Sequence, residues 1–95
     1  MDMNEIKRLL VMYDDLRVIA KKLHKLDEAG CNYGLSSRQE KRRNNLIQAA
    51  SIIAAYMGLA IYHQGDPQEW PLYLVPPDGK NHDCDYCNGV AISPL

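Results

Sequence analysis

Residues 52–63 read Ile-Ile-Ala-Ala-Tyr-Met-Gly-Leu-Ala-Ile-Tyr-His, and the character of the chain changes at the glycine within them, Gly58. Before Gly58 the chain has no proline, and its apolar residues recur every three or four positions, as in amphipathic helices. After it come all five prolines and short runs in which apolar and polar residues alternate. The sequence therefore predicts one α+β domain over residues 1–95. An antiparallel helical hairpin (1–58) is followed by a small three-stranded antiparallel sheet (59–95).

The apolar spacing predicts two helices joined by a short reversal of the chain. The first helix is expected from Asn4 to Glu28, because Gly30 and Gly34 favour the backbone conformations that end a helix. The second is expected to begin at a capping box formed by Ser37 and Glu40 and to end at the glycine that closes the hairpin. Because the connection is short, the two helices should run antiparallel.

Three strands are expected beyond the hairpin, at Leu59–His63, Leu72–Val75 and Val90–Ile92. Alternation along each strand predicts that one set of side chains faces the helices: Leu59, Ile61, Leu72, Leu74, Val90 and Ile92. The opposite set contains Tyr62, Tyr73 and Ala91. Because helices cover only one side of the sheet, the tyrosine side is expected to be exposed.

The helical half of the chain is basic. Residues 1–50 hold ten Lys and Arg against seven Asp and Glu, whereas residues 51–95 hold one against five. In an antiparallel hairpin the end of the first helix lies beside the start of the second, which gathers basic side chains at one tip: Lys21, Lys22, Lys25, Arg38, Lys41, Arg42 and Arg43. Such a patch attracts phosphate groups or an acidic protein surface. The alternative is an ordinary solvated helix surface.

Aromatic residues form a second candidate surface. Tyr62 and Tyr73 on the outward side of the sheet, with Trp70 nearby, are of the kind that stack on bases or anchor protein interfaces. For Trp70 the alternative is that it folds over the small core, since the chain contains no Phe. The predicted partner-binding residues are Lys21, Lys25, Arg38, Lys41, Arg42, Tyr62, Trp70 and Tyr73.

One run has the spacing of metal ligands. His82, Cys84 and Cys87 place three zinc-binding side chains close together, and Cys31 or His63 is a conceivable fourth ligand. A second ligand pair at matching spacing is missing from the sequence, and a plain loop with reduced cysteines is the preferred interpretation. No metal or other cofactor is therefore predicted, and a small zinc-stabilised structural protein is kept as an alternative.

The sequence predicts a cytosolic binding protein rather than an enzyme. It contains no Ser/His/Asp arrangement, no paired carboxylates in a plausible apolar cleft and no glycine-rich phosphate loop at a strand-to-helix junction. Three cysteines and the opening Met-Asp-Met-Asn-Glu predict a reducing cytosol. The apolar run at residues 46–62 is interrupted by polar residues and predicts a core helix, so no membrane partner is expected.

Three segments carry a resemblance to a known group of proteins. They are residues 32–42 (Asn-Tyr-Gly-Leu-Ser-Ser-Arg-Gln-Glu-Lys-Arg), 62–67 (Tyr-His-Gln-Gly-Asp-Pro) and 71–75 (Pro-Leu-Tyr-Leu-Val). Together they resemble small uncharacterised accessory proteins encoded by bacteriophages, prophages and plasmids. In that pattern an Arg-Gly pair commonly follows the Asp-Pro pair, where this chain has Gln68-Glu69.

The resemblance implies a protein of the bacterial cytoplasm that acts by binding. The first hypothesis is that it inhibits a host component, a protein or ribonucleoprotein of a defence system such as a CRISPR effector, as a monomer or small homo-oligomer. The second is a nucleic-acid or nucleotide-binding module, in which Arg38, Lys41 and Arg42 meet phosphate while Tyr62 and Tyr73 stack on bases.

Overall fold

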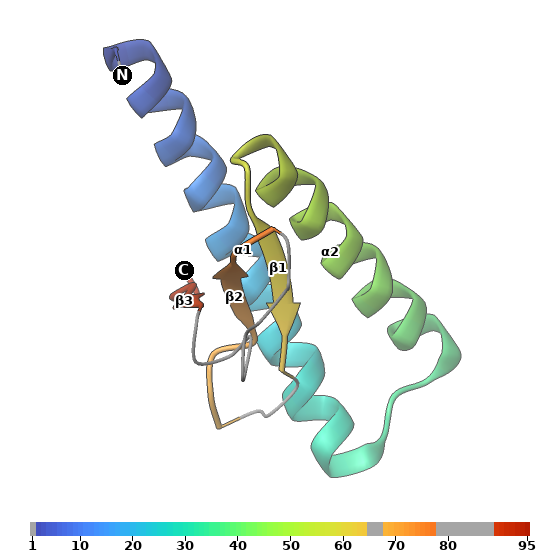
Figure 1. Cartoon of the computed structure of the whole chain (residues 1–95). Coiled ribbons are helices and arrows are strands. Elements are labelled where there is room, and N and C mark those ends of the chain that lie inside the picture. The colour runs from blue at the N-terminus through green and yellow to red at the C-terminus, as the bar shows by residue number, and fades with distance from the viewer. Residues whose placement is uncertain (1, 65–67, 78–88) are drawn as a thin grey trace.

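The protein consists of a helical hairpin that packs on one side of a small sheet (Figure 1). The structure, a computed structural model, describes residues 2–64, 68–77 and 89–95, with the backbone alone described at 31–33. Its elements, in chain order, are α1 (Met3–Tyr33), α2 (Ser37–Tyr56), β1 (Ala60–His63), β2 (Leu72–Val75) and β3 (Val90–Ala91). This α+β arrangement confirms the predicted fold class.

Helix α1 is longer than the sequence predicts. Its N-terminus is capped by Asp2, whose side chain accepts a hydrogen bond from the Glu5 amide at 2.8 Å. At the other end the helix continues through Gly30 to Tyr33 and stops at Gly34, which has a φ of 72°. The expected end at Glu28 is therefore wrong, because Gly34 and not Gly30 takes the left-handed conformation that glycine favours.

The N-cap of helix α2 lies one residue before the predicted cap. The N-cap residue is Ser36, whose backbone is extended. Its hydroxyl accepts a hydrogen bond from the Gln39 amide at 3.2 Å, and the Gln39 side chain accepts one from the Ser36 amide at 2.9 Å. The box predicted at Ser37 and Glu40 is thus wrong by one position. The chain holds two overlapping patterns of this kind, and the backbone conformation at Ser36 selects the first.

The end of α2 is a Schellman turn that leads directly into the sheet. The Gly58 amide donates to the Ala55 carbonyl at 3.0 Å, and the Leu59 amide donates to the Ala54 carbonyl at 2.9 Å. Gly58 has a φ of 77°, which an L-residue adopts only with strain. Gly58 thus lies between the last residue of α2 and the first residue of β1.

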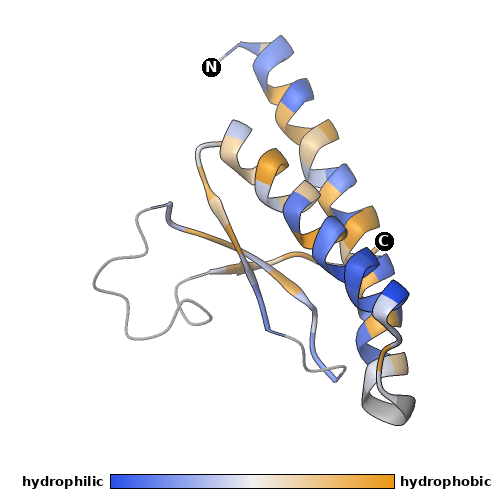
Figure 2. Cartoon of the chain, turned by 90° about the vertical axis from the view of Figure 1, so that its right-hand side faces the viewer, coloured by the Kyte–Doolittle hydropathy of each residue, from blue (hydrophilic) through white to orange (hydrophobic). Residues whose placement is uncertain are grey.

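The sheet is antiparallel, in the order β1-β2-β3. Tyr62 lies opposite Tyr73, and Leu74 lies opposite Val90. The expected strands extended to Leu59 and Ile92, which instead flank β1 and β3. Figure 2 shows both helices on one side of the strands, as the sequence predicts.

The C-terminal segment ties the sheet back to α1. The Arg17 side chain donates through Nε to the Ser93 carbonyl at 3.0 Å, and the Leu95 amide donates to the Arg17 carbonyl at 3.2 Å. Before them, the Ile92 amide donates to the Leu72 carbonyl at 2.9 Å. These bonds place Ile92, which is fully buried, between the sheet and the hairpin.

The core lies where the hairpin meets the sheet. Its fully buried residues come from α1, α2, β2 and the C-terminal segment: Leu16, Ala20, Leu23, Ala50, Ala54, Leu72 and Ile92. The alanines allow the helices to approach closely. In the described part of the chain, no helix combines the length and the apolar character that a bilayer crossing requires.

The two sides of the sheet differ from prediction at two points. Val90 is 64% exposed and adds nothing to the core, because it lies on the short edge strand β3. Conversely, the side opposite the helices is not fully exposed. Val75 is buried there, and Tyr62 and Tyr73 are half-buried because their rings lie beside one another, with centroids 6.5 Å apart.

Candidate functional site

A groove between the C-terminal part of α1 and the N-terminal part of α2 is the candidate site. It has a volume of about 390 Å³. Three of its lining residues come from α1 and two from α2: Lys22, Lys25, Leu26, Gln39 and Arg42. The antiparallel hairpin brings them together, since residues near the end of the first helix face residues near the start of the second. We call this feature the basic groove.

The basic groove is electropositive and lacks a lining carboxylate. Within residues 2–64, 68–77 and 89–95, the ion pairs are Arg17–Asp14, His24–Glu28 and His63–Asp27. None of them involves the three cations of the groove. The start of α2 adds the positive end of its helix dipole on the same side. A negatively charged group entering the groove therefore meets cations that are not already neutralised.

The capping box also orients one wall of the groove. A backbone N–H can only donate, so the Gln39 atom that faces the Ser36 amide must be the carbonyl oxygen, Oε1. The amide nitrogen of Gln39, with two N–H donors, is then turned away from that bond. Lys22, Lys25 and Arg42 carry donors only. The polar groups available to a ligand in this groove are accordingly mostly hydrogen-bond donors, since the Gln39 oxygen already accepts one bond.

The other predicted basic residues lie outside the groove. Lys21, Arg38 and Lys41 are exposed on the same two helices but do not line it. Of the predicted partner-binding residues, Lys25 and Arg42 line the groove. Figure 2 shows strongly hydrophilic colouring along the N-terminal half of α2, the part of the helix that contains Arg38, Lys41 and Arg42.

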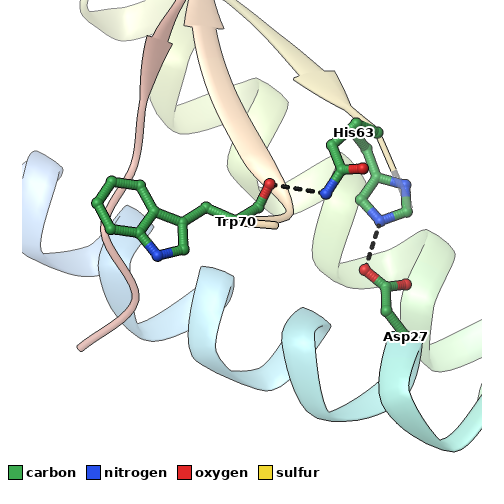
Figure 3. Close-up of polar contacts among 4 residues, drawn as sticks. Asp27, His63 and Trp70 are labelled. Carbon is green, nitrogen blue, oxygen red and sulfur yellow. Dashed lines mark hydrogen bonds and ion pairs between the residues drawn. The ribbon is translucent and has the colours of Figure 1, made fainter. Parts of the chain in front are cut away.

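The aromatic residues belong to a different surface. Tyr62 and Tyr73 lie on the sheet face that is turned away from the helices, with an angle of 59° between their rings. Trp70 is 47% exposed, so it does not close over the core. Its carbonyl accepts a 2.8 Å hydrogen bond from the Gln64 side chain, and its indole points away from His63 (Figure 3). The sheet and the core thus separate Tyr62 and Tyr73 from the basic groove.

A buried polar pair joins α1 to the sheet, and sequence reasoning missed it. His63 donates through Nε2 to the Asp27 carboxylate at 3.2 Å, and the two side chains are 17% and 3% exposed (Figure 3). Asp27 continues the buried stripe of Leu16, Ala20 and Leu23 at helical spacing. A carboxylate at a core position of an amphipathic helix requires a partner. The core position of Asp27 was the sequence signal that could have revealed this pair. The sequence does not identify the partner, because His63 is 36 residues away.

The predicted metal ligands cannot be placed, because His82, Cys84 and Cys87 lie outside the described residues. Elsewhere, in the described ranges, no group of three or more His, Cys, Asp or Glu side chains is arranged to hold a metal ion. His63, a conceivable fourth ligand, is bonded to Asp27 instead.

Tyr73 is expected to ionise later than exposed tyrosines. Burial, and secondly the charge of Glu69, raise the pKa of its phenol above the ordinary value of 10.0. The folded state therefore holds this proton more tightly than the unfolded state. The stability from this difference is present below about pH 10 and is lost as the pH rises through the folded-state pKa.

The raised pKa of Tyr73 can be measured by following the absorbance of ionised tyrosines as the pH is increased. Circular dichroism at each pH checks that the protein is still folded. Tyr73→Phe should remove a component that ionises above pH 10, because the pKa of this phenol is raised in the folded protein. The prediction is wrong if the component lost in this variant ionises at or below the ordinary tyrosine pKa of 10.0.

Comparison with protein-family models, curated proteins and solved structures gives no match for this chain.

Proposed function

We propose that this protein is a non-enzymatic accessory protein of a mobile genetic element. It binds and inhibits a host component, such as part of a defence system, by engaging an anionic group in the basic groove. The observation that supports this proposal is the groove itself. Two helices bring Lys22, Lys25 and Arg42 to one concavity without a neutralising carboxylate in its lining. The mobile-element setting rests on the resemblance of residues 32–42, 62–67 and 71–75.

A single interface that combines phosphate contacts with base stacking is disfavoured. The cations lie in the helical layer, whereas Tyr62 and Tyr73 lie on the opposite side of the sheet. A single strand cannot lie along both surfaces without passing around the domain. The tyrosine side is therefore left out of the proposed contact, and the groove is the part to test.

Capture from host lysate with matched charge reversals tests the proposal. The groove variant carries Lys25→Glu and Arg42→Glu. The control variant carries Lys7→Glu and Arg8→Glu, which make the same change of charge at exposed positions near the other end of α1. We expect the groove variant to lose the partner and the inhibition, and the control to retain both.

Nuclease treatment and a second ionic strength identify the kind of partner. Binding to nucleic acid should vanish with nuclease and fall steeply with salt, whereas a protein partner should survive nuclease. If the groove variant captures and inhibits the same component as the unmodified protein, the proposal is wrong.

A further inference from the structure

The donor character of the basic groove restricts what binds there. Lys22, Lys25 and Arg42 cannot accept hydrogen bonds, and the Gln39 carbonyl is held by the Ser36 amide. A ligand that directs N–H donors at these cations would leave those donors without acceptors where water is displaced, which costs binding energy. A peptide carries such donors along its backbone, even when its side chains are acidic. A phosphoryl group offers only acceptors and negative charge, which this lining matches.

The number and spacing of the cations point to more than one phosphate. Lys22 and Lys25 lie one helical turn apart on α1, and Arg42 approaches from α2. Arginine presents a planar fork of donors that matches two phosphoryl oxygens, while each lysine acts as a point charge. Three positive charges around one groove suit a ligand whose negative charges are adjacent, as in a diphosphate.

The size of the groove favours a small molecule. Its volume of about 390 Å³ lies within the roughly 300–1,000 Å³ range of small-ligand pockets. Leu26 supplies an apolar part of the lining, beside which a nucleoside can pack. Arg38 and Lys41, which a polynucleotide would contact as a continuing track of cations, lie outside the lining.

We infer that the basic groove is a binding site for a small diphosphate ligand of the nucleotide class. Lys25 and Arg42 contact its phosphates from opposite helices, Lys22 and Gln39 supply further donors, and Leu26 contacts the nucleoside. This inference rests on the proposed function and names the anionic group that the protein engages.

Calorimetric titration of the purified protein tests the inference directly. The probes are a nucleoside diphosphate, pyrophosphate, the nucleoside, a short oligonucleotide and an acidic peptide. We expect the nucleoside diphosphate to bind best, pyrophosphate to bind more weakly and the nucleoside not to bind. Lys25→Gln and Arg42→Gln should each weaken nucleoside diphosphate binding about tenfold, as expected for the loss of one charge-assisted contact. Lys7→Gln should leave it unchanged.

A second variant separates the two halves of the ligand. Leu26→Ala should weaken binding of the nucleoside diphosphate and leave pyrophosphate unaffected. All substituted lysine and arginine positions are exposed, and circular dichroism checks that each variant is folded. The inference is overturned if neither phosphate probe binds, if the groove variants bind normally, or if the oligonucleotide or acidic peptide binds better than the nucleoside diphosphate.

These outcomes are distinguishable from failure of the proposed function. Loss of lysate capture in the groove variant without diphosphate binding would remove the inference and leave the proposed function in place. Diphosphate binding that depends on Lys25 and Arg42, combined with capture and inhibition that do not, would remove the proposed function and leave the inference in place.

Discussion

Leu72→Ala is expected to lower the free energy of unfolding by about 2–5 kcal/mol, because it leaves a cavity in the centre of the core. The Leu72 side chain is fully buried between the sheet and the hairpin, and its carbonyl accepts the hydrogen bond from Ile92. A small domain has only about 5–15 kcal/mol of stability in total. The substitution should therefore remove a large fraction of it, which urea denaturation measures.

Two neighbouring substitutions serve as controls for this effect. Val90→Ala lies in the same sheet but at a position 64% exposed, so it should change stability by no more than about 0.5 kcal/mol. Tyr73→Ala should cost less than Leu72→Ala, because Tyr73 is only half-buried on the opposite side. If Tyr73→Ala proves the more damaging change, the assignment of the core to the helix-facing side of the sheet is wrong.

His63→Leu is expected to destabilise the protein by about 3 kcal/mol, because it leaves the Asp27 carboxylate buried without its partner. That carboxylate is 3% exposed and accepts its hydrogen bond from His63 at 3.2 Å. His24→Leu is the matched control. It breaks a 3.4 Å pair with Glu28, whose side chain is 55% exposed, and should cost about 0.5 kcal/mol or less.

A double-mutant cycle isolates the His63–Asp27 interaction. Replacing both residues with leucine removes the unpaired charge, so the double variant should be more stable than His63→Leu alone. Urea denaturation of the four proteins gives the coupling free energy. If the stability losses of the two single variants add up to the loss of the double variant, the two side chains do not stabilise one another.

The order and type of the elements were predictable from local patterns, whereas two helix boundaries were not. Gly58 lies at the end of α2, and β2 covers Leu72–Val75, the strand predicted there. The error at the end of α1 arose because Gly30 and Gly34 are equally able to end a helix by composition. In the structure Gly30 instead allows a close approach of Leu35, whose Cγ lies 3.1 Å from where a Cβ on Gly30 would be. That contact exists only after the chain has folded.

The candidate site was partly predictable for a similar reason. Charge and the antiparallel connection were enough to bring Lys25 and Arg42 together. Which of the other cations share their groove depends on the rotation of each helix about its axis, and this is set by packing in the core. His63 and Asp27 are distant in sequence, and their contact requires the crossing of α1 by β1.

The alanines at the helix–helix contact also have a consequence for the width of the basic groove. Ala20 on α1 and Ala50 and Ala54 on α2 have no exposed surface and belong to one core cluster, and such small side chains allow two helices to approach closely. The same two helices form the opposing walls of the basic groove. Larger residues at these three positions would move the walls apart while every lining residue stayed the same. The width of the basic groove can therefore change through the interior of the protein, at positions that do not line the groove.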